Sequence, residues 1–116
     1  MAGKGNNIVA GSGNVFADLG LRDVDEKHTR VRLAVAINNI IRARRLSQIS
    51  AASLLQINQP KVSALANYRL DGFSVERLMH FLNALDRDVE IIIRKKPRSR
   101  GNGKIVVTEM QPSIAG

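Results

Sequence analysis

Several short apolar runs, each at helical spacing and separated by only a few polar residues, limit the folds open to this chain. The run SQISAASLLQ begins at Ser47, a favourable N-cap, and predicts a helix of about nine residues. Asn58 caps a second short helix from Gln59 to about Asn67, and a third begins after Ser74. Helices this short and closely joined are expected to pack at steep angles. The side chains predicted to face the core are Leu55, Val62, Leu65, Leu78, Phe81, Leu82 and Leu85.

A longer amphipathic helix of about twenty residues is predicted ahead of these runs. An acidic cluster at residues 23–26 suits the positive end of the helix macrodipole, and arginines at 42–45 suit its negative end. Arg30, Asn38 and Arg45 are predicted on other faces than the apolar stripe. The stripe consists of Leu33, Ile37, Ile40 and Ile41.

Near the C-terminus the spacing of the apolar residues changes from that of a helix to that of a strand. From Asp88 the β-branched run VEIIIR and, after the turn-prone GNG at 101–103, the run IVVT at 105–108 predict a β-hairpin. An isolated two-stranded hairpin is only marginally stable. We therefore expect its apolar residues to pair or pack across a dimer interface; these are Val89, Ile91 and Ile93.

The charge distribution favours a polyanionic partner such as nucleic acid. The chain of 116 residues has a net charge of +8, and no acidic residue occurs between Glu26 and Asp71. An anion is therefore expected to bind to this central segment. Its basic residues are Lys27, Arg30, Arg32, Arg42, Arg44, Arg45, Lys61 and Arg69.

Other classes of function find little support in the sequence. There is no cysteine for a disulfide, a thiolate metal site or a nucleophile. His28 and His80 lie far apart, and Gly11-Ser12-Gly13 lacks the rest of a dinucleotide-binding loop, so we predict no metal and no cofactor. The sequence shows neither a nucleophile with a neighbouring general base nor a pair of catalytic carboxylates, so no enzyme is predicted. Without a signal peptide or a run of about 18 apolar residues, a cytoplasmic, nucleoid-associated protein is expected.

Two short helices joined by a tight turn are what a helix-turn-helix needs to enter the DNA major groove, which is roughly 12 Å wide. Here the helix from Gln59 has polar residues at its N-terminal end and buries Val62 and Leu65. Pro60 is tolerated in its first turn because the missing N–H has no intrahelical partner there. The residues left away from the core are Gln59, Pro60, Lys61, Ser63, Ala64 and Asn67.

The run LSQISAASLLQINQPKVSAL resembles the helix-turn-helix of the lambdoid phage repressors, the XRE family, over about residues 30–86. Together with NVFADLGL, LDGFSVERLMHFLNAL and DVEIIIRKKP, it is similar to HigA-type antitoxins. The resemblance implies a mainly α, lambda-repressor-like domain that binds a palindromic double-stranded operator as a homodimer, represses its own operon and neutralises a RelE-like toxin. A stand-alone regulator without a toxin, or a protein-binding antitoxin that no longer reads DNA, remain the alternatives.

Carried over by position, the resemblance implies that Gln48 contacts a phosphate and that Gln59 reads a base. Lys61 and Arg69 are expected at phosphates. The arginines at 42–45 and the basic segment 94–104 each have two explanations, nucleic-acid contact or a purely structural or solubilising role. The full predicted DNA-binding set is Gln48, Asn58, Gln59, Pro60, Lys61, Ser63, Ala64, Asn67 and Arg69.

Two residues depart from the family pattern. Gln56 occupies the turn position where glycine is usual, and a non-glycine residue with positive φ costs on the order of 1 kcal/mol. Ala64 replaces a longer polar side chain; it can touch a thymine methyl group but cannot hydrogen-bond to a base.

Four parts are predicted along the chain. Within the first, NVFADLGL could dock on the domain itself or on a partner. The parts are an N-terminal arm at 1–22, a helix-turn-helix DNA-binding domain at 23–88, a β-element with a basic loop at 89–108 and a disordered tail at 109–116.

Overall fold

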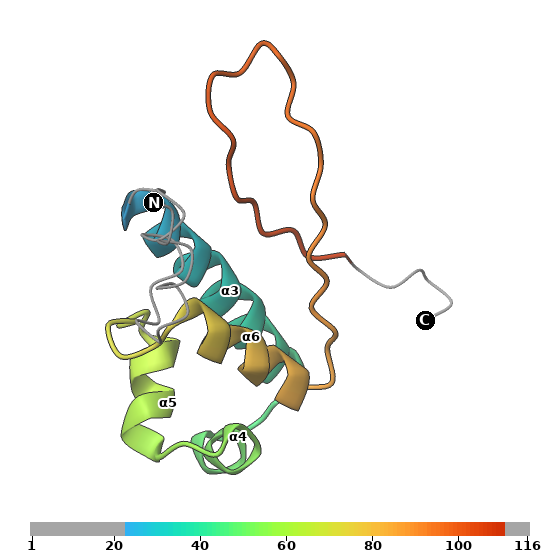
Figure 1. Cartoon of the computed structure of the whole chain (residues 1–116). Helices are drawn as coiled ribbons and strands as arrows, with labels where there is room; N and C mark the ends of the chain where they lie inside the picture. Colours follow the sequence, from blue (N-terminus) through green and yellow to red (C-terminus); the bar gives the residue numbers. More distant parts are fainter. Residues whose placement is uncertain (1–22, 111–116) are drawn as a thin grey trace, which may run out of the picture.

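The computed structural model describes residues 23–110, and its helical part contains the four predicted helices (Figure 1). The helices are α3 (Asp23–Ala43), α4 (Gln48–Leu55), α5 (Gln59–Ala66) and α6 (Val75–Ala84). α6 packs along α3, whereas α4 and α5 pack together at one end of the molecule. None of these helices is long and apolar enough to cross a bilayer. The predicted N-terminal arm and the last residues of the predicted tail lie outside the described range.

Side-chain oxygens cap the N-termini of the three short helices. Ser47 Oγ accepts a hydrogen bond from the Ser50 N–H at 3.0 Å. Asn58 Oδ1 accepts from the Lys61 N–H at 2.9 Å, and Ser74 Oγ accepts from a backbone N–H in the first turn of α6. Each cap satisfies one of the N–H groups that a helix leaves without an internal acceptor. The predicted caps at Ser47 and Asn58 are therefore confirmed.

All four helices end at a non-glycine residue in the left-handed region. At the end of α4, Gln56 has φ 58° and ψ 46°. Its N–H donates to Ser53 O and the Ile57 N–H donates to Ala52 O, which is the hydrogen-bond pattern of a Schellman motif. The unusual turn conformation predicted for Gln56 is confirmed. The other helices end in the same way at Arg45 (φ 54°), Tyr68 (φ 57°) and Asp86 (φ 65°).

Replacing Gln56 by glycine is expected to raise the free energy of unfolding by about 1 kcal/mol, because glycine adopts this conformation without the steric cost of a Cβ. Ser53→Gly, an exposed position inside α4, is the matched control and should lower stability by a similar amount. Urea unfolding followed by circular dichroism measures both. A loss of stability in Gln56→Gly would contradict the strain assigned to this turn.

The core lies between α3 and α6 and is closed at one end by α5. Its fully buried large side chains are Ile37, Leu65, Leu78 and Leu85. Phe73, in the loop before α6, stacks edge-on against Phe81 with 5.8 Å between ring centroids. The predicted inward residues are confirmed as buried, except that Ile41 is only half-buried at the edge of the core.

Two polar side chains of α3 are structural, which corrects their predicted placement on outer faces. Asn38 is buried, and its Nδ2 donates to the carbonyl of Leu65 at 3.1 Å, which ties α3 to the end of α5. Arg30 is half-buried and donates to the carbonyls of Leu70 and Phe73 at 3.3 and 3.4 Å. Asn38 thus satisfies a carbonyl of the last turn of α5, and Arg30 satisfies two carbonyls on the segment that leads from α5 to α6.

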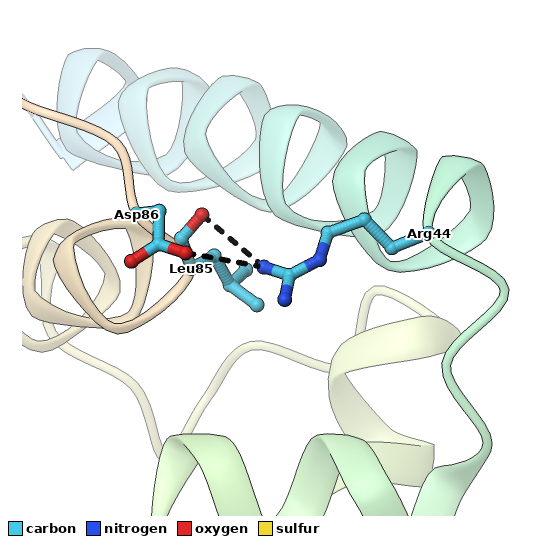
Figure 2. Close-up of polar contacts among 3 residues, drawn as sticks. All are labelled: Arg44, Leu85 and Asp86. Atoms are coloured by element: carbon cyan, nitrogen blue, oxygen red, sulfur yellow. Dashed lines mark hydrogen bonds and ion pairs between the residues drawn. The ribbon is translucent and has the colours of Figure 1, made fainter.

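Arg44 links the ends of α3 and α6. Its Nη1 donates to the carbonyl of Leu85 at 3.4 Å and lies 4.0 Å from Asp86 Oδ2 (Figure 2). The carbonyl is one of those that α6 leaves unpaired at its C-terminus. Of the two explanations open for the arginines at 42–45, Arg44 therefore has a structural one.

The predicted C-terminal hairpin is wrong for a single copy of the chain. Residues 87–110 run out and back as an open arm, and within the described residues no strand and no backbone hydrogen bond joins its two sides (Figure 1). Val89 and Val107 pack against the core, but the isoleucines beyond them are exposed. A two-stranded ribbon needs a layer that buries one face, and basic residues on both sides of the loop at 94–104 repel each other.

Candidate nucleic-acid interface

α4 and α5 form a compact pair joined by the turn at residues 56–58. The pair is held together by small and branched side chains that are nearly inaccessible to solvent. These are Ala51 (0% exposed), Leu55 (5%), Val62 (4%) and Leu65 (0%). Since Val62 and Leu65 face inward, the opposite side of α5 is available to a partner. In Figure 1 this pair lies at the opposite end of the molecule from the loop at the tip of the C-terminal arm.

The outward side of α5 carries short polar side chains. Gln59 and Pro60 in its first turn and Asn67 after its last turn are exposed, while Ser63 and Ala64 are half-buried. Ala64 also packs against the core, so its methyl group is only partly available to a base. The structure therefore brings together most of the predicted groove-facing residues and leaves Gln59 as the longest amide among them.

Two of the predicted DNA-binding amides already have structural partners. The side-chain oxygen of Asn58 caps α5 through the Lys61 N–H. The Asn67 Nδ2 donates to the carbonyl of Ser63 at 2.9 Å at the other end of the helix. Both residues are exposed, but each has one polar atom committed to holding α5 in shape.

Lys61 lies on the flank of α5 rather than at the centre of its outward side. Its Nζ is 5.8 Å from the centroid of the Phe73 ring, and the side chain is half-buried. Arg77 approaches the same ring at 6.0 Å. A cation at the side of this helix can reach the phosphate backbone at the edge of a groove, and the phosphate contact of Lys61 stays a prediction.

The N-terminus of α4 offers a second contact. Gln48 is the first residue of α4, is exposed, and follows the Ser47 cap. Because Ser47 satisfies only the N–H of Ser50, the N–H groups of Gln48 and Ile49 have no intrahelical acceptor. A phosphate oxygen is the kind of acceptor that such a helix end binds.

The basic residues of the central segment divide into two groups. Arg30 and Arg44 are tied to backbone carbonyls, as described above. Arg45 and Arg69, which follow α3 and α5, are exposed. The basic loop at 94–104 projects away from α5 in Figure 1, so it is not placed to contact the same stretch of duplex.

The structure also identifies residues near this surface that the sequence did not point to. Tyr68 is 43% exposed directly after α5 and holds the left-handed conformation that ends the helix. Asn38 fixes α5 from behind through Leu65. Of the two, only Tyr68 could have been found from the sequence, because it directly follows a predicted helix at a position where glycine is usual.

Two short helices at a tight turn, with the second helix buried on one side and polar on the other, define a helix-turn-helix DNA-binding domain. The comparisons with known proteins agree. The chain belongs to the family described as "Helix-turn-helix domain", whose model matches residues 15–94.

A solved structure described as "Putative XRE Family Transcriptional Regulator" is 62% identical in sequence to this chain. It superposes with a TM-score of 0.74, and the match covers 77% of this chain and 100% of that one. No functionally curated protein matches the sequence. At this identity and coverage, the chain is an XRE-family, DNA-binding transcriptional regulator.

Proposed function

We propose that this regulator binds a palindrome-like operator as a homodimer and represses transcription, without catalytic activity of its own. The exposed polar N-terminal end of α5 is the observation that carries the proposal. Two copies related by a two-fold axis would place their α5 helices in successive major grooves, about 34 Å apart. Gln59 would hydrogen-bond to a base, whereas Gln48, Lys61 and Arg69 would contact phosphates on either side.

Replacing Gln59 by alanine is expected to weaken binding to the operator by roughly 1–3 kcal/mol while leaving binding to unrelated DNA nearly unchanged, because only the base contact is lost. Lys61→Ala should instead weaken binding to both DNAs to a similar extent, because phosphates are present in every sequence. Fluorescence anisotropy with the operator, identified by footprinting upstream of the gene, and with a scrambled duplex separates the two effects. Equal losses on both duplexes for Gln59→Ala would contradict its role as a base reader.

We further propose that the protein is the antitoxin of a type II toxin–antitoxin pair, with a RelE-like ribonuclease as its toxin. The similarity of four segments, from NVFADLGL to DVEIIIRKKP, to HigA-type antitoxins supports this. Expression of the chain together with its neighbouring genes and purification through a tag on this chain tests the pairing. A small basic protein that co-purifies and inhibits translation when expressed alone is the expected result. Without such a protein, the stand-alone regulator is the better account.

A further inference from the structure

The inner half of the C-terminal arm exposes a continuous apolar surface. Ile91, Ile92 and Ile93 are 77%, 64% and 93% exposed. The segment 88–94 is extended, and within the described residues none of its backbone groups makes a hydrogen bond. An extended, β-branched segment with unpaired backbone groups is a template for pairing with another strand.

The sequence of this segment, DVEIIIR, complements itself when it is read antiparallel about Ile91. In that register Val89 lies opposite Ile93 of the second copy, and Ile91 lies opposite its own equivalent on the two-fold axis. Side chains alternate along a strand, so all three share one face, and every pair on that face is apolar. Val89 already packs against the core, so this face continues the core surface outward.

The charges of the segment fit the same register. Asp88 lies opposite Arg94 of the second copy, and the two-fold axis generates the pair twice. A slip by one residue would place Val89 opposite Arg94 and mix the two faces. A slip by two, which centres the pairing on Ile92, would place Lys95 opposite Val89, next to the core.

The helical domain offers a surface for the paired arms. A groove of about 910 Å³ lies between the arm and the helices α3 and α6. Its walls include both sides of the arm. Its apolar floor is formed by Leu33, Ala36, Ile40, Met79 and Leu82. A second arm laid along the first would cover this groove and extend the interface beyond a bare pair of strands, which alone would be marginal.

We propose that two copies of this chain join through residues 88–94, which pair as antiparallel strands with Ile91 on the two-fold axis. This assignment rests on the homodimer of the proposed function and names the surface and the register that form it. The arm is extended but unpaired in one copy because its hydrogen-bond partner is the same segment of the other copy. In Figure 1 the arm and α5 lie on opposite sides of the molecule, so this pairing leaves both α5 helices uncovered.

Disulfide cross-linking tests the register directly, because the chain has no cysteine of its own. In the proposed pairing, Ile91→Cys places two thiols opposite each other within the roughly 4.4–6.8 Å Cα separation that a disulfide spans. Ile93→Cys places the equivalent residues four positions out of register, roughly 14 Å apart along the strand. Ile92→Cys tests the alternative register, slipped by two residues, in which Ile92 instead of Ile91 would lie on the two-fold axis.

The three variants are oxidised in a glutathione buffer without DNA and separated on a non-reducing gel. Rapid formation of a covalent dimer by Ile91→Cys, with at least tenfold slower cross-linking of the other two, is the expected result. Equal rates for all three, or fastest cross-linking at Ile92 or Ile93, overturn the register. A wild-type chain that sediments as a monomer at micromolar concentration overturns the interface itself, including the case where the arm pairs only with a different protein.

Charge reversal gives a second, independent readout. Asp88→Arg should weaken dimerisation by ~10-fold, because both copies of the cross-strand ion pair become repulsive. The double variant Asp88→Arg with Arg94→Asp should restore it, and Arg98→Glu, in the loop outside the paired segment, should leave it unchanged. Sedimentation equilibrium measures the dissociation constant, and failure of the double variant to recover overturns the pairing.

Duplex binding is measured separately on the same proteins. A wild-type chain that dimerises as described but binds no DNA would contradict the proposed function and leave the interface intact. A wild-type chain that binds its operator while the cross-linking pattern fails would contradict only the interface.

Discussion

Replacing Leu65 by alanine is expected to lower the free energy of unfolding by roughly 2–5 kcal/mol, the usual range for a leucine removed from a rigid core. Leu65 is 0% exposed, and it lies where α5 closes the core between α3 and α6. The cavity cannot collapse easily, because the Leu65 carbonyl is held by Asn38 and the backbone there is part of the helix end. A domain of this size has only about 5–15 kcal/mol of stability in total, so the variant would unfold at much lower urea concentrations.

Leu54→Ala is the matched control for this prediction. The same chemical change is made in the neighbouring helix α4, but Leu54 is 37% exposed. Its loss should cost less than about 1 kcal/mol, as for most partly exposed positions. Urea melts of both variants give the comparison, and similar costs at the two sites would show that α5 is not anchored through Leu65.

DNA affinity is expected to fall roughly 100-fold when the salt concentration rises from about 50 to about 200 mM. Lys61 and Arg69 of two copies would neutralise about four phosphates, which gives a slope of about −3.6 in a plot of log affinity against log salt concentration. Lys61→Ala should reduce the slope to about −1.8, because one phosphate contact is lost in each copy.

Lys27→Ala removes the same charge from the first part of α3, at the other end of the molecule from α4, and serves as the control. Its slope should equal that of the unmodified protein. Anisotropy titrations at four salt concentrations on one operator duplex provide the measurement. A slope near zero for the unmodified protein would contradict the electrostatic part of the interface.

Local signals in the sequence were sufficient for the helices and for most of the candidate DNA surface. Ser47 and Asn58 mark helix starts because their side chains cap nearby N–H groups, which needs no knowledge of the rest of the fold. The strained turn at Gln56 was predicted from the resemblance instead, because the family usually has glycine at that position. The exposure of Gln48 and Gln59 followed from the period of the apolar residues around them.

What the sequence could not provide depends on contacts between distant segments. Asn38 lies at the edge of an apolar stripe, and only the position of the Leu65 carbonyl on another helix makes it a buried residue. The flank position of Lys61 depends on Phe73, which follows in the next loop. For VEIIIR and IVVT, β-propensity predicted a hairpin, but strand pairing also needs a layer that buries one face of the ribbon, and the sequence of these two segments does not show whether one exists.

The left-handed helix ends have a consequence for how such a regulator can change its operator. No glycine occurs between residues 23 and 71, although three helices end in that stretch at residues with positive φ. At each of these positions, a single substitution to glycine is therefore expected to raise the free energy of unfolding by about 1 kcal/mol. New side chains on α5 that alter base recognition commonly lower stability by a similar amount. A change such as Gln56→Gly, at a position outside the predicted DNA-binding set, would allow the protein to acquire them one at a time and stay folded throughout.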